Sequence, residues 1–561
     1  MSNLLAHPGA LLIAGAVGLI VLRGRVRTAV ALIVPLVALY VAWQVPDGIA
    51  AQARFLDYEI APFAGDKLSR LFAIIFAIMV FGGALFALNQ TKALELPAAF
   101  LYGGSAIGVA FAGDLITVFV FWEIMAIGST LVVWSAGGRS AYRASLRYLM
   151  IHLLGGVLLM AGIAGHVAEF GSIAFGSMTL DSPAHWLILA GFLINAGAPP
   201  LSAWLPDAYP EASWSGMVFL SAFTTKTAVY VLLRGFPGTE LLLYIGLFMI
   251  FYGIVYALLE NDMRRILAYS IVNQVGFMVA GVGIGTEMAL NGSAAHAFTH
   301  IIYKALLLMS AGSVLLMTGK SKCTDLGGLF QSMPLTAACG IIGALSISSF
   351  PLTSGFVSKS MISQAAVDEH MLYIWILLAA ASAGVFLHAG IKFPWFVFFQ
   401  KDSGMRPPDP PLNMRLAMLL FSALCIVLGV FPGPLYELLP YEVRFVPYTG
   451  AHVVTQLQLL LFSGLAFFVM LNYLRRTPTI TLDVDWVYRR LLPPLCAAAA
   501  SGLSRLGETF SAAASALSSR LVAALHQHHG PEGVLARTWP TGSMALWVMV
   551  LLLAYLLFYY L

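Results

Sequence analysis

The sequence predicts an all-α, polytopic membrane helix bundle. Of its 561 residues, 60% are hydrophobic and only 10% are charged, whereas about a quarter of the residues are charged in an ordinary soluble domain. Apolar runs long enough to cross a bilayer recur along the whole chain, as is typical of membrane-spanning helices. The small net charge of +4 gives no indication of nucleic-acid binding.

About sixteen spans are expected, each a run of apolar residues bounded by polar ones. The first run, Leu4–Leu22, has no basic segment before it and no clear cleavage site, so it is predicted to be a retained helix and not a signal peptide. The predicted spans are 4–22, 28–45, 70–89, 97–113, 115–136, 148–168, 185–204, 215–233, 241–259, 266–286, 294–317, 335–366, 371–396, 414–431, 455–473 and 541–561.

The loops between these spans predict an orientation. Sixteen lysines and arginines fall in alternate loops, and only five fall in the loops between them, which places the N-terminus outside by the positive-inside rule. The inner set is Arg23, Arg25, Arg27, Lys92, Arg139, Arg143, Arg147, Arg264, Arg265, Lys320, Lys322, Lys401, Arg406, Arg415, Arg475 and Arg476; the outer set is Arg54, Lys67, Arg70, Arg234 and Arg444.

A polar stripe lies within the apolar run Ala294–Leu315. His296, His300 and Lys304 stand four residues apart, so on a helix they share one face. A lysine in mid-membrane costs on the order of 3 kcal/mol, so the stripe predicts a protein interior or a water-filled path that handles protons. The structural alternative is that each histidine is an ordinary hydrogen-bonded residue of the core and that the lysine extends to the lipid headgroups. Ligation of haem or metal by the two histidines is a third interpretation, although two ligands one turn apart could not bind opposite faces of a haem.

Two predicted spans are interrupted. In the seventh, Pro199 and Pro200 break the apolar run, and in the twelfth, Ser346–Gly355 places Pro351 in mid-membrane. Proline removes a backbone donor and clashes with the preceding turn, and such breaks are tolerated only where the freed groups face protein or water. A pair of interrupted helices indicates a transport path, with ordinary proline kinks as the alternative.

Further ionisable residues fall inside apolar spans. Glu123 lies in the fifth, Lys226 in the eighth and Lys359 just after the break in the twelfth. Lys392 lies at the end of the thirteenth span. A side chain that extends to the lipid headgroups accounts for this lysine as well as a place in the proton pathway does. A buried carboxylate and a buried lysine whose spacing or hydration changes could bind and release a proton. A static ion pair that fixes helix packing is the alternative.

The last hundred residues differ from the rest. Leu495–His526 runs without proline, with apolar residues at three-, four- and seven-residue steps, and predicts an amphipathic helix along a surface. A final span, Gly542–Leu561, returns across the membrane. The four cysteines form no CxxC pair, and no Gly-rich nucleotide motif is present, so no cofactor and no metal site is predicted.

Taken together, these motifs resemble the antiporter-like, proton-conducting membrane subunits shared by respiratory complex I and Mrp-type multisubunit Na⁺/H⁺ antiporters. The match runs from Pro97 to Lys392 through FWEIMAIGS, PPLSAWLPDAYPEA, TTKTAVYVLLR, AHAFTHIIYKALLLMSAGSV, DLGGLFQSMP and SSFPLTSGFVSKSMI. The TTKTAVYVLLR motif is most similar to the D-type subunit of the Mrp antiporters, whereas the lateral helix with its returning span is more similar to the largest antiporter-like subunit of complex I. The resemblance implies two inverted five-helix repeats with broken helices, joined by a hydrated axis of buried charges.

Residue by residue, the resemblance implies a proton pathway made of Glu123, Lys226, His296, His300, Lys304 and Lys359. The chain departs from the family at Asn195, where the seventh-helix lysine that pairs with the Glu123 position is expected. Asparagine cannot hold a proton. Either Lys226 takes over the pairing, or the first half-channel no longer moves protons.

The resulting hypothesis is a proton-translocating subunit, with Na⁺/H⁺ exchange left open, of a multisubunit cation/proton antiporter in the bacterial inner membrane. Its partners would be other membrane subunits, H⁺, Na⁺ and the bilayer, with no nucleic acid and no catalytic residue of its own. The alternatives are a pumping subunit of a complex I-like or hydrogenase-linked complex and a structural subunit with a disabled channel. The predicted regions are N-terminal helices (1–96), first repeat (97–234), second repeat (241–396), C-terminal helices (397–476), cytoplasmic-side lateral helix region (477–540) and final span (541–561).

Overall fold

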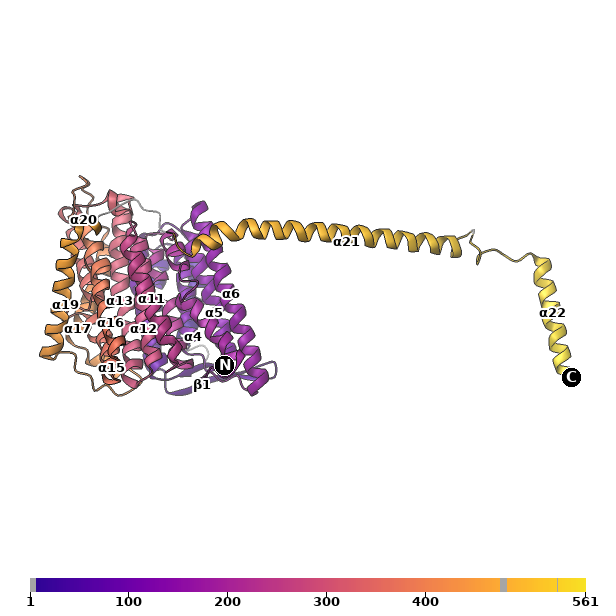
Figure 1. Cartoon of the computed structure of the whole chain (residues 1–561), viewed down its shortest axis with the longest axis horizontal. Coiled ribbons are helices and arrows are strands. Elements are labelled where there is room, and N and C mark those ends of the chain that lie inside the picture. Colours follow the sequence, from indigo (N-terminus) through magenta and orange to yellow (C-terminus); the bar gives the residue numbers. More distant parts are fainter. Residues whose placement is uncertain (1–6, 475–481, 532) are drawn as a thin grey trace. The chain divides into compact units, whose positions relative to one another are not determined.

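The computed structural model of the chain describes residues 7–474, 482–531 and 533–561. The chain divides into a large unit that ends at Asp485 and a smaller unit, Trp486–Leu561. In the large unit the helices lie side by side in one bundle (Figure 1). Twelve helices of the described residues are long and apolar enough to cross a membrane. Shorter helices occupy the other predicted spans, so each predicted span corresponds to at least one helix, the last of them in the smaller unit.

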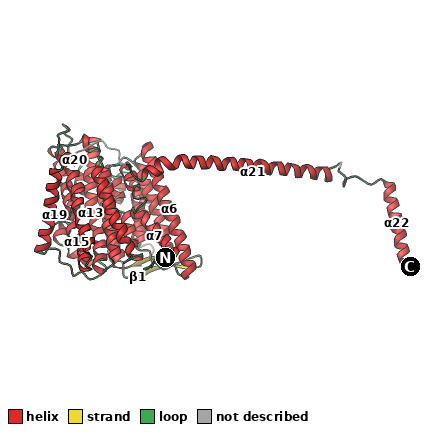
Figure 2. Ribbon diagram, viewed as in Figure 1, coloured by secondary structure: helices red, strands yellow, loops and turns green. Residues whose placement is uncertain are grey.

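The chain begins with two helices and a β-hairpin. The hairpin, which the sequence pattern did not predict, is the yellow element of Figure 2. Its second strand is fastened to the start of the fifth span, because the backbone N–H of Ala61 donates to Oδ2 of Asp114 at 2.8 Å. The elements are α1 (Pro8–Val21), α2 (Gly24–Gln44), β1 (Gly48–Phe55), β2 (Tyr58–Gly65) and α3 (Lys67–Phe86).

The region predicted as the first repeat contains two interrupted spans. The seventh span stops at Ala196, turns through Gly197 at a left-handed φ of 76° and resumes at Trp204, which confirms the predicted break. The eighth span is also divided, at residues 221–223, without any proline or glycine to signal it. The elements are α4 (Glu95–Ala110), α5 (Leu115–Ser135), α6 (Gly138–Phe170), α7 (Pro183–Ala196), α8 (Trp204–Ala208), α9 (Gly216–Leu220) and α10 (Thr224–Gly235).

The region predicted as the second repeat contains α13 (Glu287–Thr318), which is buried along most of its length and packs against α3, α12, α14, α15 and α17. The twelfth span stops at Ile347 and resumes at Ser354, as predicted. The thirteenth span turns π-helical in η5 (Phe386–Lys392) and η6 (Trp395–Phe399). The other elements are α11 (Glu240–Leu259), α12 (Met263–Ile284), α14 (Pro334–Ile347), α15 (Ser354–Asp368) and α16 (Leu372–Val385).

The large unit ends with further helices and a docked segment. Tyr252 of α11 and Tyr269 of α12 both donate to Oδ2 of Asp483, the latter at 2.7 Å, and Tyr256 donates to the Leu482 carbonyl at 2.9 Å. Three tyrosines therefore hold the chain to α11 and α12 just before the small unit begins. The helices are α17 (Leu412–Val430), α18 (Gly433–Glu437), α19 (Gly450–Val469) and α20 (Leu471–Leu474).

The small unit is made of two long helices. The predicted amphipathic helix is present as α21 (Leu492–His529), which follows a short π-helical turn, η7 (Val487–Leu491). The final span is α22 (Thr541–Tyr560). Every residue of α21 is exposed within the chain.

Six loops lie at one end of the bundle: 22–23, 87–94, 209–215, 260–262, 319–333 and 400–411. We call this end the basic face, because most of the basic residues of the predicted inner set lie in these loops or in the helix ends next to them. Hydrogen bonds join several of them, from Arg27 to the Ala93 carbonyl and from Gln90 to Ser213, and from Arg264 to the Pro210 carbonyl. The hairpin lies at the other end, the hairpin face, with the loops at 111–114, 171–182, 369–371 and 431–449. This arrangement agrees with the predicted alternation of loops; Arg475 and Arg476 lie outside the described residues.

Candidate functional site

The break in the twelfth span positions Lys359. The helix α14 ends at Ile347, and Lys359 sits in the second turn of α15, 2% exposed, with its Nζ 3.5 Å from the Ile347 carbonyl oxygen. The last carbonyls of a helix have no intrahelical partner and carry partial negative charge. An interrupted helix in mid-bundle therefore supplies an acceptor for a buried ammonium group.

The break in the eighth span likewise supplies a backbone carbonyl acceptor for Lys226. Its Nζ, fully buried, donates to the carbonyl of Ser221 at 2.7 Å and to Oγ1 of Thr225 at 3.1 Å. Ser221 follows the last residue of α9, so the acceptor is again a carbonyl released where a helix stops. Lys226 and Lys359 are therefore held in the same way, each beside a carbonyl where a helix is interrupted.

The stripe on α13 lies between these two lysines, and all three of its side chains are fully buried. Nζ of Lys304 donates to Oγ of Ser270 on α12 at 2.8 Å. Neither ring nitrogen of His300 has a hydrogen-bond partner among the residues that the structure describes. A neutral imidazole with a free lone pair can accept a proton.

His296 connects α13 to α12 and α15. Its Nε2 lies 3.1 Å from Oε1 of Gln274, and its Nδ1 lies 3.3 Å from Oγ of Ser358, the residue next to Lys359. The Phe277 ring lies against both groups, 6.3 Å from the His296 ring and 5.1 Å from Nζ of Lys359. His296 therefore lies at the boundary between the stripe and the second broken helix.

The buried basic groups form one electrostatically coupled row. His300 interacts with the charges of Lys226 and Lys304, and His296 interacts with those of Lys359 and Lys226. Unit charges a few ångströms apart at intermediate dielectric influence each other by a few kcal/mol. A proton added at one member therefore changes the affinity of its neighbours. We call Lys226, His300, Lys304, His296 and Lys359 the buried row.

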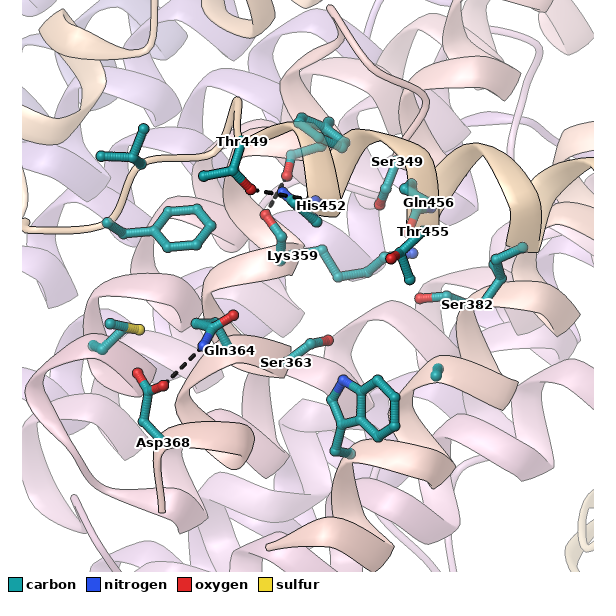
Figure 3. A pocket seen from close by; sticks show the side chains of 18 of the residues that line it. Ser349, Lys359, Ser363, Gln364, Asp368, Ser382, Thr449, His452, Thr455 and Gln456 are labelled. Atoms are coloured by element: carbon teal, nitrogen blue, oxygen red, sulfur yellow. Dashed lines mark hydrogen bonds between the residues drawn. The ribbon is translucent and has the colours of Figure 1, made fainter. Parts of the chain in front are cut away.

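A cavity leads from the buried row to the hairpin face. It has a volume of about 470 Å³ and is lined by Lys359 at its inner end and by Asp368 and Arg444 at the bundle end. Figure 3 shows Ser349, Thr455 and Gln456 beside Lys359, with the hydrogen-bonded pair Gln364 and Asp368 further along. Such polar walls can hold water up to the lysine.

Glu123 stands apart from the buried row. Its Oε1 is buried against α6 and has no hydrogen-bond partner within the described parts of the chain. Lys226 bonds to Ser221 and Thr225, and no ion pair joins it to Glu123 among the described residues. The place of Glu123 in the proton pathway, which its position in the fifth span suggested, stays a prediction.

Asn195, at the position where the family lysine was expected, lies on the last turn of α7 and bonds to a histidine. Its Oδ1 lies 2.7 Å from Nδ1 of His152 on α6. His152 is 1% exposed and was not singled out from the sequence. The sequence offers only its position within the long apolar stretch of α6, and a histidine that merely packs in the core would have the same position.

Two further basic residues on η5 are also buried. Nδ1 of His388 lies 2.8 Å from the Gly384 carbonyl oxygen, and its ring interacts with the charges of Lys304 and Lys359. Nζ of Lys392 donates to three carbonyls at the end of α11, among them Ala257 at 3.1 Å and Glu260 at 2.6 Å. Lys392 therefore caps a helix, which its position in the sequence did not reveal.

The fold and the buried row together define an antiporter-like membrane subunit. The family described as "NADH:quinone oxidoreductase/Mrp antiporter, TM" matches residues 112–386. NADH-quinone oxidoreductase subunit N of Desulforudis audaxviator is 30% identical over 425 residues, which cover 69% of this chain and 83% of that protein. The chain therefore belongs to the NADH:quinone oxidoreductase/Mrp antiporter family of membrane subunits.

Two other comparisons agree with this assignment. The D-type subunit of the Na⁺/H⁺ antiporter of Alkalihalophilus pseudofirmus is 29% identical over 409 residues, covering 67% of this chain and 82% of that protein. A chain of the membrane-bound sulfane sulfur reductase, an archaeal respiratory membrane complex, has the same fold, with a TM-score of 0.70 at 23% identity. That match covers 98% of this chain and 99% of the other, so it extends into the small unit.

Proposed function

We propose that this chain translocates protons as the D-type subunit of a multisubunit monovalent cation/proton antiporter. One observation carries the proposal: five basic side chains, Lys226, His296, His300, Lys304 and Lys359, are buried together inside an apolar bundle. Intramembrane ionisable residues of this kind are expensive and mark ion pathways. Fixing helix packing alone would not require five of them in one row.

In this proposal a proton moves along the buried row by successive charging of neighbours. The carbonyls released at the two helix breaks stabilise the ammonium forms of Lys226 and Lys359. The proton then passes between them through the stripe on α13, where His300 and His296 offer ring nitrogens. It leaves toward the hairpin face through the cavity that starts at Lys359.

The proposed location is the cell inner membrane, with the N-terminus and the hairpin face outside. The clustering of the basic loops on one face of the bundle supports this orientation. The partners would be the other membrane subunits of the assembly, and the ions would be H⁺ and, for exchange, Na⁺. Any redox chemistry would lie in those partners, because the roles proposed for residues of this chain all concern protons.

A second candidate is a pumping subunit of a complex I-like or hydrogenase-linked redox complex. The observation in its favour is that the match to a respiratory complex covers nearly the whole chain, α21 and α22 included. The two candidates differ in what drives proton flux. A cation gradient across vesicles of the assembled complex would drive the antiporter, whereas an electron donor with quinone would drive the redox complex.

Replacing Lys304 tests the proposal. In vesicles that contain the whole complex, Lys304→Ala is expected to lower cation-driven proton flux by about tenfold or more, because the row loses its central carrier. Lys320→Ala, on the basic face, is the matched control and should leave the flux unchanged. If Lys304→Ala moves protons as fast as the wild type in a correctly assembled complex, the chain is instead a structural subunit with a disabled channel.

A further inference from the structure

Polar side chains from both neighbouring helices contact α6 at two adjacent glycines. A Cβ built on Gly156 would overlap Oε1 of Glu123, so only glycine lets this carboxylate reach the surface of α6. A Cβ on Gly155 would lie 3.6 Å from Oδ1 of Asn195. The carboxylate from α5 and the amide from α7 therefore meet the same short stretch of α6.

His152 lies on that stretch, one helical turn before Gly156 and on the same face. With the amide oxygen of Asn195 assigned as the acceptor, Nδ1–H of His152 is the donor at 2.7 Å. The lone pair of the neutral ring is then on Nε2, which has no partner in the described segments. Oε1 of Glu123 also has no hydrogen-bond partner in the described segments. A buried imidazole and a half-buried carboxylate that can exchange a proton thus meet α6 at positions one helical turn apart, 152 and 156.

The side chains between His152 and the first lysine of the buried row carry hydroxyl groups. The His152 ring packs on Tyr148 at 4.0 Å between ring centroids. The Tyr148 hydroxyl lies 3.3 Å from Oγ1 of Thr224. Thr224 is next to Thr225, whose Oγ1 accepts from Nζ of Lys226 at 3.1 Å. The path from the imidazole to the first lysine of the row is therefore lined by polar atoms in an otherwise apolar bundle.

We propose that His152 is the proton-relay residue of the first repeat, which carries protons between Glu123 and Lys226. The proton leaves the Glu123 carboxyl and binds Nε2 of His152, directly or through one water. It departs from the same Nε2 toward the Tyr148 and Thr224 hydroxyls, and Nε2 regains its lone pair. Asn195 accepts the Nδ1–H bond throughout and holds the ring with Nε2 free. This inference rests on the proposed function and supplies a base in the repeat whose seventh helix has none at position 195.

The competing explanation is that His152 only packs between Tyr148 and Trp204, whose ring lies 4.6 Å away. His152→Gln separates the two. The glutamine amide keeps an N–H donor for Asn195 but cannot carry a proton. The matched control is His7→Asn, a buried histidine at the start of α1 that caps its first turn, a task that asparagine performs well.

The assay is cation-driven proton flux in vesicles of the assembled complex, with assembly checked by size-exclusion chromatography. His152→Gln is expected to lower flux by about tenfold or more, while His7→Asn leaves it unchanged. Adding Asn195→Lys to His152→Gln should restore part of the flux, because it puts an exchangeable ammonium at the same place. Wild-type flux in His152→Gln, or a loss that Asn195→Lys does not restore, overturns the proposal.

Two arrangements keep the result decisive. If His152→Gln does not assemble, His152→Asn, with a shorter amide, is measured under the same criteria. Lys304→Ala is measured beside it: flux lost in Lys304→Ala but kept in His152→Gln refutes the relay alone, whereas flux kept in both refutes the proposed function.

Discussion

At the scale of single residues, the close fit between Glu123 and Gly156 makes a sharp prediction. A methyl group at position 156 would overlap Oε1 of Glu123, since the built Cβ lies 1.9 Å from that oxygen, well short of a van der Waals contact between carbon and oxygen. Gly156→Ala is therefore expected to destabilise the chain by about 1–3 kcal/mol or to displace the carboxylate. The checks are the thermal unfolding midpoint and the proton flux of the assembled complex.

The control for this change is Gly18→Ala, a helical glycine of α1 whose nearest neighbours to a built Cβ are 3.7 and 3.8 Å away. Alanine there should be neutral or stabilising by about 0.5 kcal/mol, because glycine is a poor helix former. Equal effects at both positions would show that the Glu123 contact is not what constrains residue 156.

The residues of the buried row could be predicted from the sequence because a lysine within a long apolar run is conspicuous. Lys226, Lys304 and Lys359 all stand out in this way, and the four-residue spacing made the two stripe histidines stand out with them. His152 and His388 could not be predicted. A single histidine in a helix gives the same pattern whether it packs or carries a proton, and only the tertiary contacts distinguish the two.

At the scale of elements, the C-terminus of α11 depends on a side chain from η5. Nζ of Lys392 donates to the carbonyls of Ala257 and Glu260 and to that of Leu258, which lies between them in the chain. Lys392→Met leaves these buried acceptors without their donor and is expected to cost about 1–3 kcal/mol. The measurement is the thermal unfolding midpoint of the purified complex.

Lys320→Met, an exposed lysine on the basic face, is the matched control and should leave the midpoint unchanged. Lys392→Arg should retain most of the stability, since a guanidinium can also donate to several carbonyls. A midpoint for Lys392→Met equal to that of the wild type would mean that water satisfies the end of α11 equally well.

The elements themselves were predictable to different degrees. Proline marked the breaks at residues 197–203 and 348–353, because it cannot continue a helix. The break before Thr224 and the π-helical turn at Phe386–Lys392 carry no such residue, and tertiary packing determines them. The hairpin Gly48–Gly65 was missed because its two strands lie between two apolar runs that dominate the pattern.

At the scale of the whole molecule, the gathering of basic loops on one face predicts how the chain lies in the membrane. The hairpin turn at Asp57 and the loop residue Lys320 lie at opposite ends of the bundle, and both are exposed. In a Cys496→Ser background, Asp57→Cys is expected to react with an impermeant maleimide on whole cells, and Lys320→Cys only after permeabilisation. The reverse pattern would place the N-terminus inside.

The number and order of the spans were predictable from the sequence because the bilayer thickness sets the length of each apolar run. The docking of Asp483 against Tyr252 and Tyr269 was not, because it joins positions more than two hundred residues apart through polar groups that leave no periodic pattern. Sequence periodicity reports which face of a helix is apolar, and it says nothing about which distant segment will cover that face.

The contact between Glu123 and Gly156 also has an evolutionary consequence. A carboxylate placed as it is at residue 123 leaves room only for the smallest residue at position 156, so the two positions should covary among homologues. Lineages that lost the acidic group would be free to acquire larger residues on α6. Lineages that kept it should retain glycine even where the surrounding helix has diverged.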